Sequence, residues 1–352
     1  MGLKLGILNL LTVLSGTSVW AQITPEEIVQ DTTTTNIIYK EASEYKASYP
    51  NRITARAFYV NTSNDLKIKD RNSDDFFNLQ PNKQNRIGAS VSFRGISGSY
   101  SFAPDFMGTN KDNEDSKLFT LSFRTFFGDH FMQTFELFKE KGFYLKFNNS
   151  DDISVYLPHS KNFKIGGATS YIWNENFSFR AITSQDEKQL KSTGSFIPRI
   201  IYYYSKFNLE GNSTETGDYI DFSYYSFDIA FAPSYYYNYV PTNNLLLSGG
   251  VSAGIGLNHS KSEGEDALNS LLTELNFRAA ATYDIDNLYL GAHYSYLILN
   301  HSADRSSRAA DNIPYFQIFV GYRFKAPKSL VGFADDMQNK MNNKIDNLKH
   351  KS

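Results

Sequence analysis

Apolar and polar side chains alternate with a period of two along most of this chain, which constrains its fold more than any other feature. In one example Ile87, Ala89, Val91 and Phe93 are separated by glycine and serine. The pattern recurs in segments that begin at Ile96, Phe119, Phe131, Phe177, Phe227, Leu245, Leu275, Leu288 and Phe316. Such alternation marks β-strands with one apolar and one polar face. The pattern ends near Phe324 and predicts an all-β fold.

The lengths of the segments and of their connections indicate a barrel. Several segments run for about 10–14 residues, whereas globular strands average about 5–6 and a tilted membrane strand needs about 9–11. Short turns such as Arg94-Gly95 and Gly128-Asp129 alternate with long polar connections at 61–83, 105–116, 148–162, 208–221, 260–269 and 301–312. We predict a transmembrane antiparallel up-and-down β-barrel of about 12–14 strands over residues 52–324. The up and down directions conflict between Ser184 and Asp221, so one strand there is missing or superfluous.

The N-terminus has the pattern of an export signal. Lys4 precedes an apolar run from Leu5 to Leu14, which is too short to span a bilayer as a helix. We expect a signal peptide at residues 1–21 with cleavage before Gln22, the alternatives being an uncleaved anchor or a buried helix. Residues 22–51 are polar and are expected to form a periplasmic leader, with one short helix around 37–49.

The C-terminus has a different periodicity. Residues 325–352 are expected to form an amphipathic helical tail, because apolar residues recur every three or four positions between Lys328 and Lys349. Its end is basic, and on the barrel interpretation the tail is periplasmic. It would dock on its own barrel, plug the mouth, lie on the inner leaflet or bind a periplasmic partner.

Composition excludes several classes of protein. The chain contains no cysteine, so it has neither disulfides nor a cysteine-ligated metal site. The net charge of −2 lacks the basic surplus of a nucleic-acid binder, so we expect no nucleic acid as partner. A mean hydropathy of −0.42 argues against a helical membrane protein.

Three segments carry a resemblance to a known family. They are Gln133–Leu145, Phe177–Arg180 leading to Gln189–Phe196, and Phe319–Pro327. Together they resemble a family of uncharacterised outer-membrane β-barrel proteins, known as a domain of unknown function and found mainly in Bacteroidetes-type bacteria. The resemblance covers roughly residues 45–330. It implies a barrel fold and an outer-membrane location, and it supplies no activity.

The polar faces of the predicted strands supply the candidate site residues. If the apolar faces meet lipid, the lumen face carries Arg94, Arg124, Arg180, Arg199, Arg278, Arg323, Glu136, Asp228, Glu274 and His293. The arginines outnumber the three carboxylates, and guanidinium groups can brace a lumen through ion pairs or line a path for anions. Both interpretations stay open, and we expect outer-membrane lipid and a small anionic or amphipathic solute as partners.

Catalytic chemistry is poorly supported by the sequence. His293 and Ser295 would share the lumen face of one strand. Barrel hydrolases use serine and histidine on adjacent strands, because the base must reach the hydroxyl, and nothing here fixes a third residue. Gly249-Gly250 precedes no helix, so it is not a phosphate loop, and Asp74-Asp75 and Asp151-Asp152 are isolated pairs. We predict no catalytic residue, metal or cofactor. The expected function is passage or binding of a small solute, or a structural role. The alternatives are a barrel hydrolase of lipid or lipopolysaccharide and a soluble exported β-protein.

Overall fold

A computed structural model describes residues 40–41, 43–49, 51–62, 65–70, 76–107, 116–147, 154–183, 185–212, 219–264, 266–302 and 307–349. The expected signal peptide at 1–21 and the leader up to residue 39 lie outside these ranges. So do the aspartate pairs at 74–75 and 151–152.

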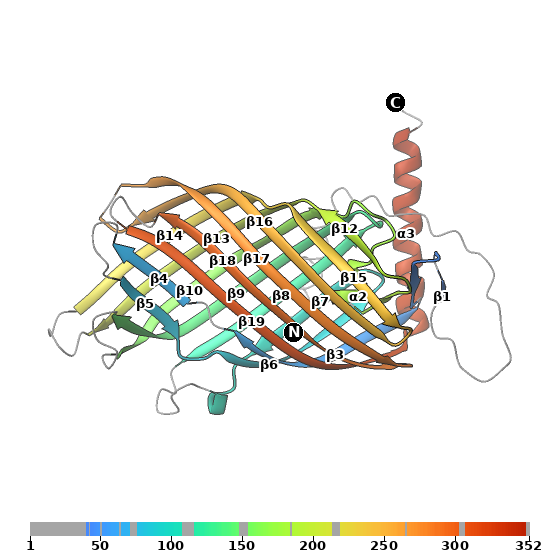
Figure 1. Cartoon of the computed structure of the whole chain (residues 1–352), viewed down its shortest axis with the longest axis horizontal. Coiled ribbons are helices and arrows are strands. Elements are labelled where there is room, and N and C mark those ends of the chain that lie inside the picture. The colour runs from blue at the N-terminus through green and yellow to red at the C-terminus, as the bar shows by residue number, and fades with distance from the viewer. Residues whose placement is uncertain are drawn as a thin grey trace.

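Twelve antiparallel strands form a closed ring, which confirms the predicted barrel and its strand number (Figure 1). The ring strands are β3 (Arg52–Thr62), β6 (Asn85–Phe93), β7 (Ile96–Phe102), β8 (Lys117–Phe127), β9 (Phe131–Phe147), β10 (Ser154–Tyr171), β13 (Arg199–Asn212), β14 (Tyr219–Phe231), β16 (Leu245–Ser262), β17 (Leu268–Ile285), β18 (Leu288–Ser302) and β19 (Ser307–Lys325). β19 pairs with β3 and closes the ring. Its two ends are here called the turn end, which carries the short connections such as Arg94-Gly95, and the loop end.

Apolar side chains cover the outside of the ring. On β16 the exposed fractions of Ile255 and Leu257 are 58% and 63%, whereas the neighbouring Asn258 is 1% exposed and faces inward. Aromatic residues gather on the outside near the turn end, where Trp173 is 67% exposed and Tyr239 is 51% exposed. A tall apolar band edged by aromatic rings is the surface that a barrel presents to hydrocarbon. Within the described residues, no helix combines the length and apolarity needed to cross a membrane.

The ring has fewer strands at its loop end. β4 (Asp65–Asp70) continues the line of β3 along β19, and β5 (Phe76–Pro81) takes the place of β8 along β9. Since β4 also pairs with β5, these two strands replace four. The sequence prediction of a loop over residues 61–83 was therefore wrong, because a high content of charged and amide residues hides two short strands.

A plug occupies the turn end of the lumen. After β10 the chain turns inward over residues 172–192 and forms α2 (Phe179–Thr183) and β11 (Glu187–Gln189), before β12 (Thr193–Ile197) and β15 (Ser234–Thr242) extend the wall. The predicted strand through Phe177 and Ala181 was wrong, because one helical turn is too short to show its own periodicity. This insertion is the source of the strand-direction conflict.

The described part of the leader belongs to the plug. β2 (Lys46–Ser48) pairs with both β11 and β1 (Lys40–Glu41), where the sequence suggested a helix around 37–49. Strand pairing with β11 supplies partners for the backbone of residues 46–48 that a short helix would leave unsatisfied at its ends. Residues 40–41 and 43–49 of the leader are thus part of the plug.

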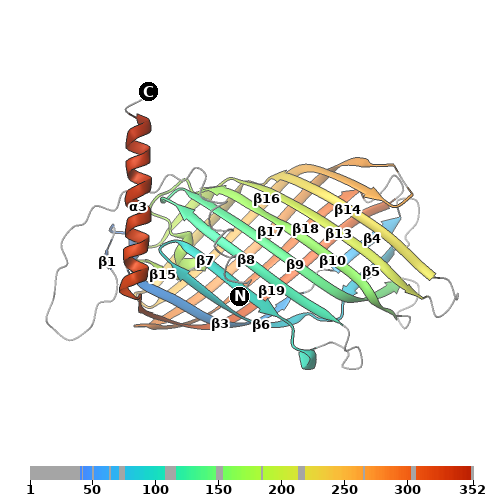
Figure 2. The same ribbon diagram turned by 180° about the vertical axis from the view of Figure 1, so that it is seen from behind.

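The C-terminal tail forms α3 (Lys328–Lys349), as predicted, after the short connection that follows β19. It runs crosswise to the barrel axis at the turn end and continues past the barrel wall (Figure 2). The Arg94 guanidinium ties it to the rim through an ion pair of 2.7 Å with Asp335. Phe333 on this helix is 62% exposed.

The candidate functional site: an arginine-lined lumen above a plug

A cavity of about 280 Å³ lies inside the barrel. Its walls come from β3, β6, β7, β8, β9, β10, β13, β15, β16, β17, β18 and β19, and the α2 residues Phe179, Ile182 and Thr183 line it from the plug. Inward-facing apolar residues fill another part of the interior near the loop end, in a cluster of Leu79, Phe143, Leu145, Leu157, Phe207 and Leu209. The polar cavity thus lies between the plug and an apolar cluster.

Cationic side chains dominate the cavity lining. Arg56, Arg86, Arg124, Arg278 and Lys164 line it, against the carboxylates of Glu136 and Glu140. None of the four arginines forms an ion pair of 4.0 Å or less within the described part of the chain. In the same part, Arg56 Nη1 and the Nε atoms of the other three guanidinium groups are buried without a hydrogen-bond partner.

Neutral side chains hold several of these charged groups in position. Arg56 Nε donates to Ser90 Oγ at 3.0 Å, and its guanidinium carbon lies 4.9 Å from the centre of the Phe319 ring. Tyr203 Oη donates to Glu136 Oε2 at 2.8 Å. Hydroxyl groups and an aromatic ring therefore hold Arg56 and Glu136 in position in the cavity.

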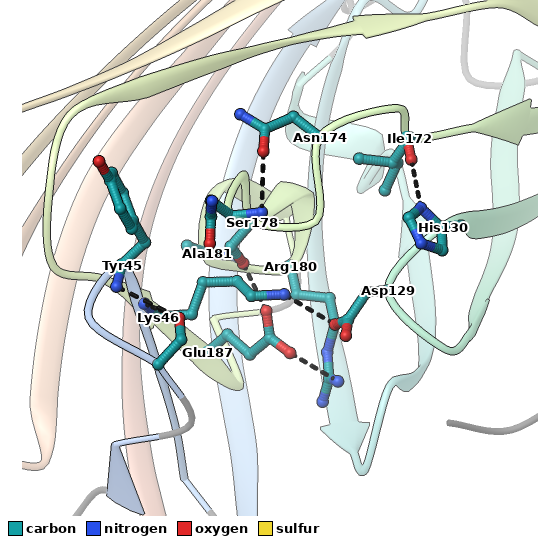
Figure 3. A network of polar contacts seen from close by, with 12 residues as sticks. Tyr45, Lys46, Asp129, His130, Ile172, Asn174, Ser178, Arg180, Ala181 and Glu187 are labelled. Atoms are coloured by element: carbon teal, nitrogen blue, oxygen red, sulfur yellow. Dashed lines mark hydrogen bonds and ion pairs between the residues drawn. The ribbon is translucent and has the colours of Figure 1, made fainter. Parts of the chain in front are cut away.

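The plug is held by ion pairs in which carboxylates accept several donors each (Figure 3). Arg180 Nη2 lies 2.8 Å from Asp186 Oδ2, and Arg180 Nη1 lies 2.8 Å from Glu187 Oε1. Glu187 Oε2 also accepts a hydrogen bond of 2.6 Å from Ser178 Oγ. Burial opposes the charge of Arg180, but the adjacent Asp186 and Glu187 carboxylates outweigh it and raise the pKa of this guanidinium.

Contacts around the ring attach the plug to the wall. The backbone N–H of Gly95 donates to Asp186 Oδ2 at 2.8 Å, and Lys46 Nζ lies 2.7 Å from Asp129 Oδ1 (Figure 3). Asn238 Nδ2 donates to the Ser178 carbonyl at 3.0 Å. These contacts reach three separate wall regions: the β6–β7 turn, the β8–β9 turn and β15.

Two further contacts attach the plug to side chains inside the barrel. Arg323 Nε donates to the Gln185 carbonyl at 2.9 Å, and its guanidinium carbon lies 4.1 Å from the Tyr49 ring centre and 4.4 Å from that of Tyr289. Phe179 of α2 packs edge-on against Tyr236, with ring centres 5.2 Å apart. Polar contacts at the rim and apolar contacts below the cavity therefore both hold the plug.

The structure divides the candidate residues from the sequence into groups. Arg124, Glu136, Arg278 and His293 line the cavity together. Arg199 and Glu274 form a buried ion pair of 2.8 Å, and Asp228 accepts a hydrogen bond of 2.6 Å from Asn258. Arg180 and Arg323 belong to the plug region, as described above. The assignment of Arg94 to a strand face was wrong, because it has a positive φ of 49° in the β6–β7 turn and pairs with α3.

Sequence reasoning missed the charged lining residues Arg56, Arg86, Glu140 and Lys164, and it missed Tyr203, which binds Glu136. The strand from Arg52 was not delimited, and the next was begun at Ile87, one position after Arg86. The signal was available: continuing the alternation backward from Ile87 places Arg86 on the polar face.

The cavity gives little support for catalysis or metal binding. His293 and Ser295 both line it, and His293 packs against Phe319 with ring centres 4.9 Å apart. No carboxylate of the described residues forms an ion pair with His293 that would orient it as a base. In the same ranges, His, Asp and Glu side chains form no group of three that could hold a metal ion.

Comparisons with solved structures find outer-membrane barrels at low similarity. The outer-membrane protease OmpT from Escherichia coli is 9% identical with a TM-score of 0.38, over 79% of this chain and 98% of that one. The COG4313 outer membrane channel from Pseudomonas putida F1 is 10% identical with a TM-score of 0.37, over 81% and 99%. The translocator domain of autotransporter NalP from Neisseria meningitidis is 10% identical with a TM-score of 0.37, over 80% and 90%. No role is transferred from these proteins.

The search of curated proteins finds no match. One family model does match, and it covers residues 40–324, which include β1, the plug and the whole barrel up to the last residue but one of β19. This chain therefore belongs to the family described as "Domain of unknown function (DUF4421)".

Proposed function

We propose that this protein is an outer-membrane barrel that binds a small anionic solute in its lumen. The apolar outer band and the short turns at one end support the membrane placement, with the turn end in the periplasm. The expected signal peptide at 1–21 supports export.

The cationic cavity carries this proposal. Five cationic side chains face two carboxylates around a volume of about 280 Å³, near the lower end of ligand pockets. Guanidinium groups without carboxylate partners are costly to enclose, and they recognise phosphate or carboxylate through paired hydrogen bonds. A phosphate or carboxylate ligand would satisfy the buried Nε and Nη1 donors of Arg56, Arg86, Arg124 and Arg278.

The plug favours binding over free passage. Phe179 and Ile182 line the cavity from below, and the plug is attached to the wall on several sides. An open pore would need a continuous aqueous path past these side chains. The purified barrel should therefore be silent in planar bilayers, whereas deletion of residues 176–189 should produce steady conductance. Steady conductance by the intact chain would refute the binding-only role.

Binding can be tested with a matched pair of probes, glucose 6-phosphate and glucose, by titration calorimetry on the folded barrel in detergent. We expect the phosphate ester alone to bind, and Arg124→Met to weaken binding by about 10-fold or more, because a hydrogen bond to a charged group contributes about 1.5–3 kcal/mol. Arg94→Met removes a charge at the rim and should bind like the wild type. Equal binding of glucose, or no effect of Arg124→Met, would contradict the proposal.

A further inference from the structure

A row of lysines lies on the outer wall, away from the lumen. Lys117 of β8, Lys139 and Lys141 of β9, Lys161 of β10 and Lys206 of β13 are here called the lysine patch. The four strands are consecutive neighbours in the ring. Strand spacing of about 4.8 Å places all five ammonium groups within about 15 Å across the wall.

Register and exposure put these lysines side by side on the outer face. Lys117 lies opposite Lys141, and Lys141 lies opposite Lys161 on the next strand. One row nearer the turn end, Phe163 separates Lys139 from Lys206. All five occupy the same face as the apolar Phe119 and Phe163.

Like charges opposite one another destabilise a sheet, so this arrangement calls for a counter-charge. Across the described residues, the ion pairs involve none of these five ammonium groups. Carboxylates on the same outer surface, Glu210 and Asp221, face each other further toward the loop end. The row of Lys139, Phe163 and Lys206 continues over Tyr225 of β14 to Lys261 of β16.

The patch lies at the upper edge of the apolar band. Trp173, in the aromatic zone at the turn end, lies twelve positions after Lys161 along the β10 segment. At about 3.3 Å per residue and a tilt of about 40°, this places Lys161 about 30 Å higher, the thickness of a hydrocarbon core. Leu121, Leu137 and Ile165 cover the wall below the patch. The lysines therefore meet the headgroups of the leaflet opposite the plug.

We infer that the lysine patch binds a glycolipid of the outer leaflet that carries two phosphates on its sugar headgroup. Five ammonium groups within about 15 Å match more than one phosphate, and a single-phosphate lipid would leave part of the patch unpaired. Phe119 and Phe163 lie between the lysines, and Lys139 Nζ lies 5.9 Å from the Phe163 ring centre. Acyl chains would pack on these rings and on the leucines below.

The test uses the full-length barrel in neutral detergent with diphosphoryl lipid A, monophosphoryl lipid A and phosphatidylglycerol as probes, read by native mass spectrometry. We expect diphosphoryl lipid A to bind most tightly. The variant Lys139→Gln/Lys161→Gln/Lys206→Gln should lose at least 10-fold in affinity, and the corresponding Arg variant should retain it. Equal binding of phosphatidylglycerol, or full retention by the Gln variant, would overturn the inference.

A matched control removes three exposed lysines at the end of β19 and on α3, Lys325→Gln/Lys328→Gln/Lys340→Gln, and should bind lipid A like the wild type. Loss of binding in this control would show a general charge effect and would contradict the patch. Full competition by inorganic phosphate would show a free-anion site instead of a lipid site. The inference rests on the proposed membrane placement, but it fails separately from the lumen site, because these variants should bind glucose 6-phosphate normally.

Discussion

Replacing Glu274 with leucine should destabilise the barrel strongly, because the change leaves the Arg199 guanidinium buried without its counter-ion. The two side chains are 0% and 7% exposed, and their charged atoms lie 2.8 Å apart. Ser252 Oγ is the bridging group, since it accepts from Arg199 Nη2 at 2.9 Å and donates to Glu274 Oε2 at 3.0 Å. A serine hydroxyl cannot replace a carboxylate.

The size of the effect follows from the burial. Breaking a buried ion pair by removing one partner costs about 3–5 kcal/mol, whereas replacing both partners with apolar residues is often neutral. We therefore expect Glu274→Leu to lower the free energy of unfolding by about 3–5 kcal/mol. The double variant Arg199→Met/Glu274→Leu should recover most of that loss. Urea unfolding of the barrel in lipid vesicles, followed by Trp173 fluorescence, measures both values.

The exposed ion pair between Lys191 and Glu44 provides a matched control, because its side chains are 50% and 69% exposed. Removing it with Glu44→Gln should cost less than about 1 kcal/mol. If Glu274→Leu cost no more than this control, or if the double variant were as unstable as the single one, the burial argument would be refuted.

Three further predictions follow from separate contacts. Gly250→Ala should lower stability by about 1–3 kcal/mol, because the new methyl group would lie 2.2 Å from the Tyr236 ring; an unchanged urea midpoint would contradict this. The hydrogen bond from Lys83 lowers the pKa of Asp105, so its stabilising effect should be complete above the ordinary pKa of 3.8 and be lost as pH falls through the lower folded-state value. Asp105→Asn should flatten that acid-side decline in an unfolding series. Expressed from residue 22, the chain keeps Trp173 as its one tryptophan, and brominated lipids should quench it most when the bromine lies near the headgroups.

The ring was predictable because every wall strand faces two different environments. Strands such as β16 and β17 alternate over most of their length, so the sequence records which of their positions face inward and which face outward. The C-terminal helix was predictable for the same reason, since its apolar residues recur at helical spacing. The strand number needed the structure, because the plug imitates a strand for five residues.

The site was only partly predictable, because lumen residues act across strands that are distant in sequence. Arg124 and Arg278 were identified from the polar faces of their own strands. Their convergence on one cavity with Arg56 depends on ring closure between β19 and β3, which no local pattern encodes. The plug contacts were also beyond reach, since Asp186 accepts a hydrogen bond from the backbone N–H of Gly95, 91 positions away, in addition to its ion pair with the nearby Arg180.

The plug is built from segments that lie far apart in the sequence, and this affects the order in which the barrel can assemble. Gln189 Nε2 donates to the carbonyl of Tyr45, which lies 144 positions away, and Arg323 supports Gln185 from the last strand. The plug can therefore reach its final structure only after β19, the last strand, has formed and has paired with β3. Before that point the plug lacks its contact with Arg323 and is attached to the wall at fewer sites.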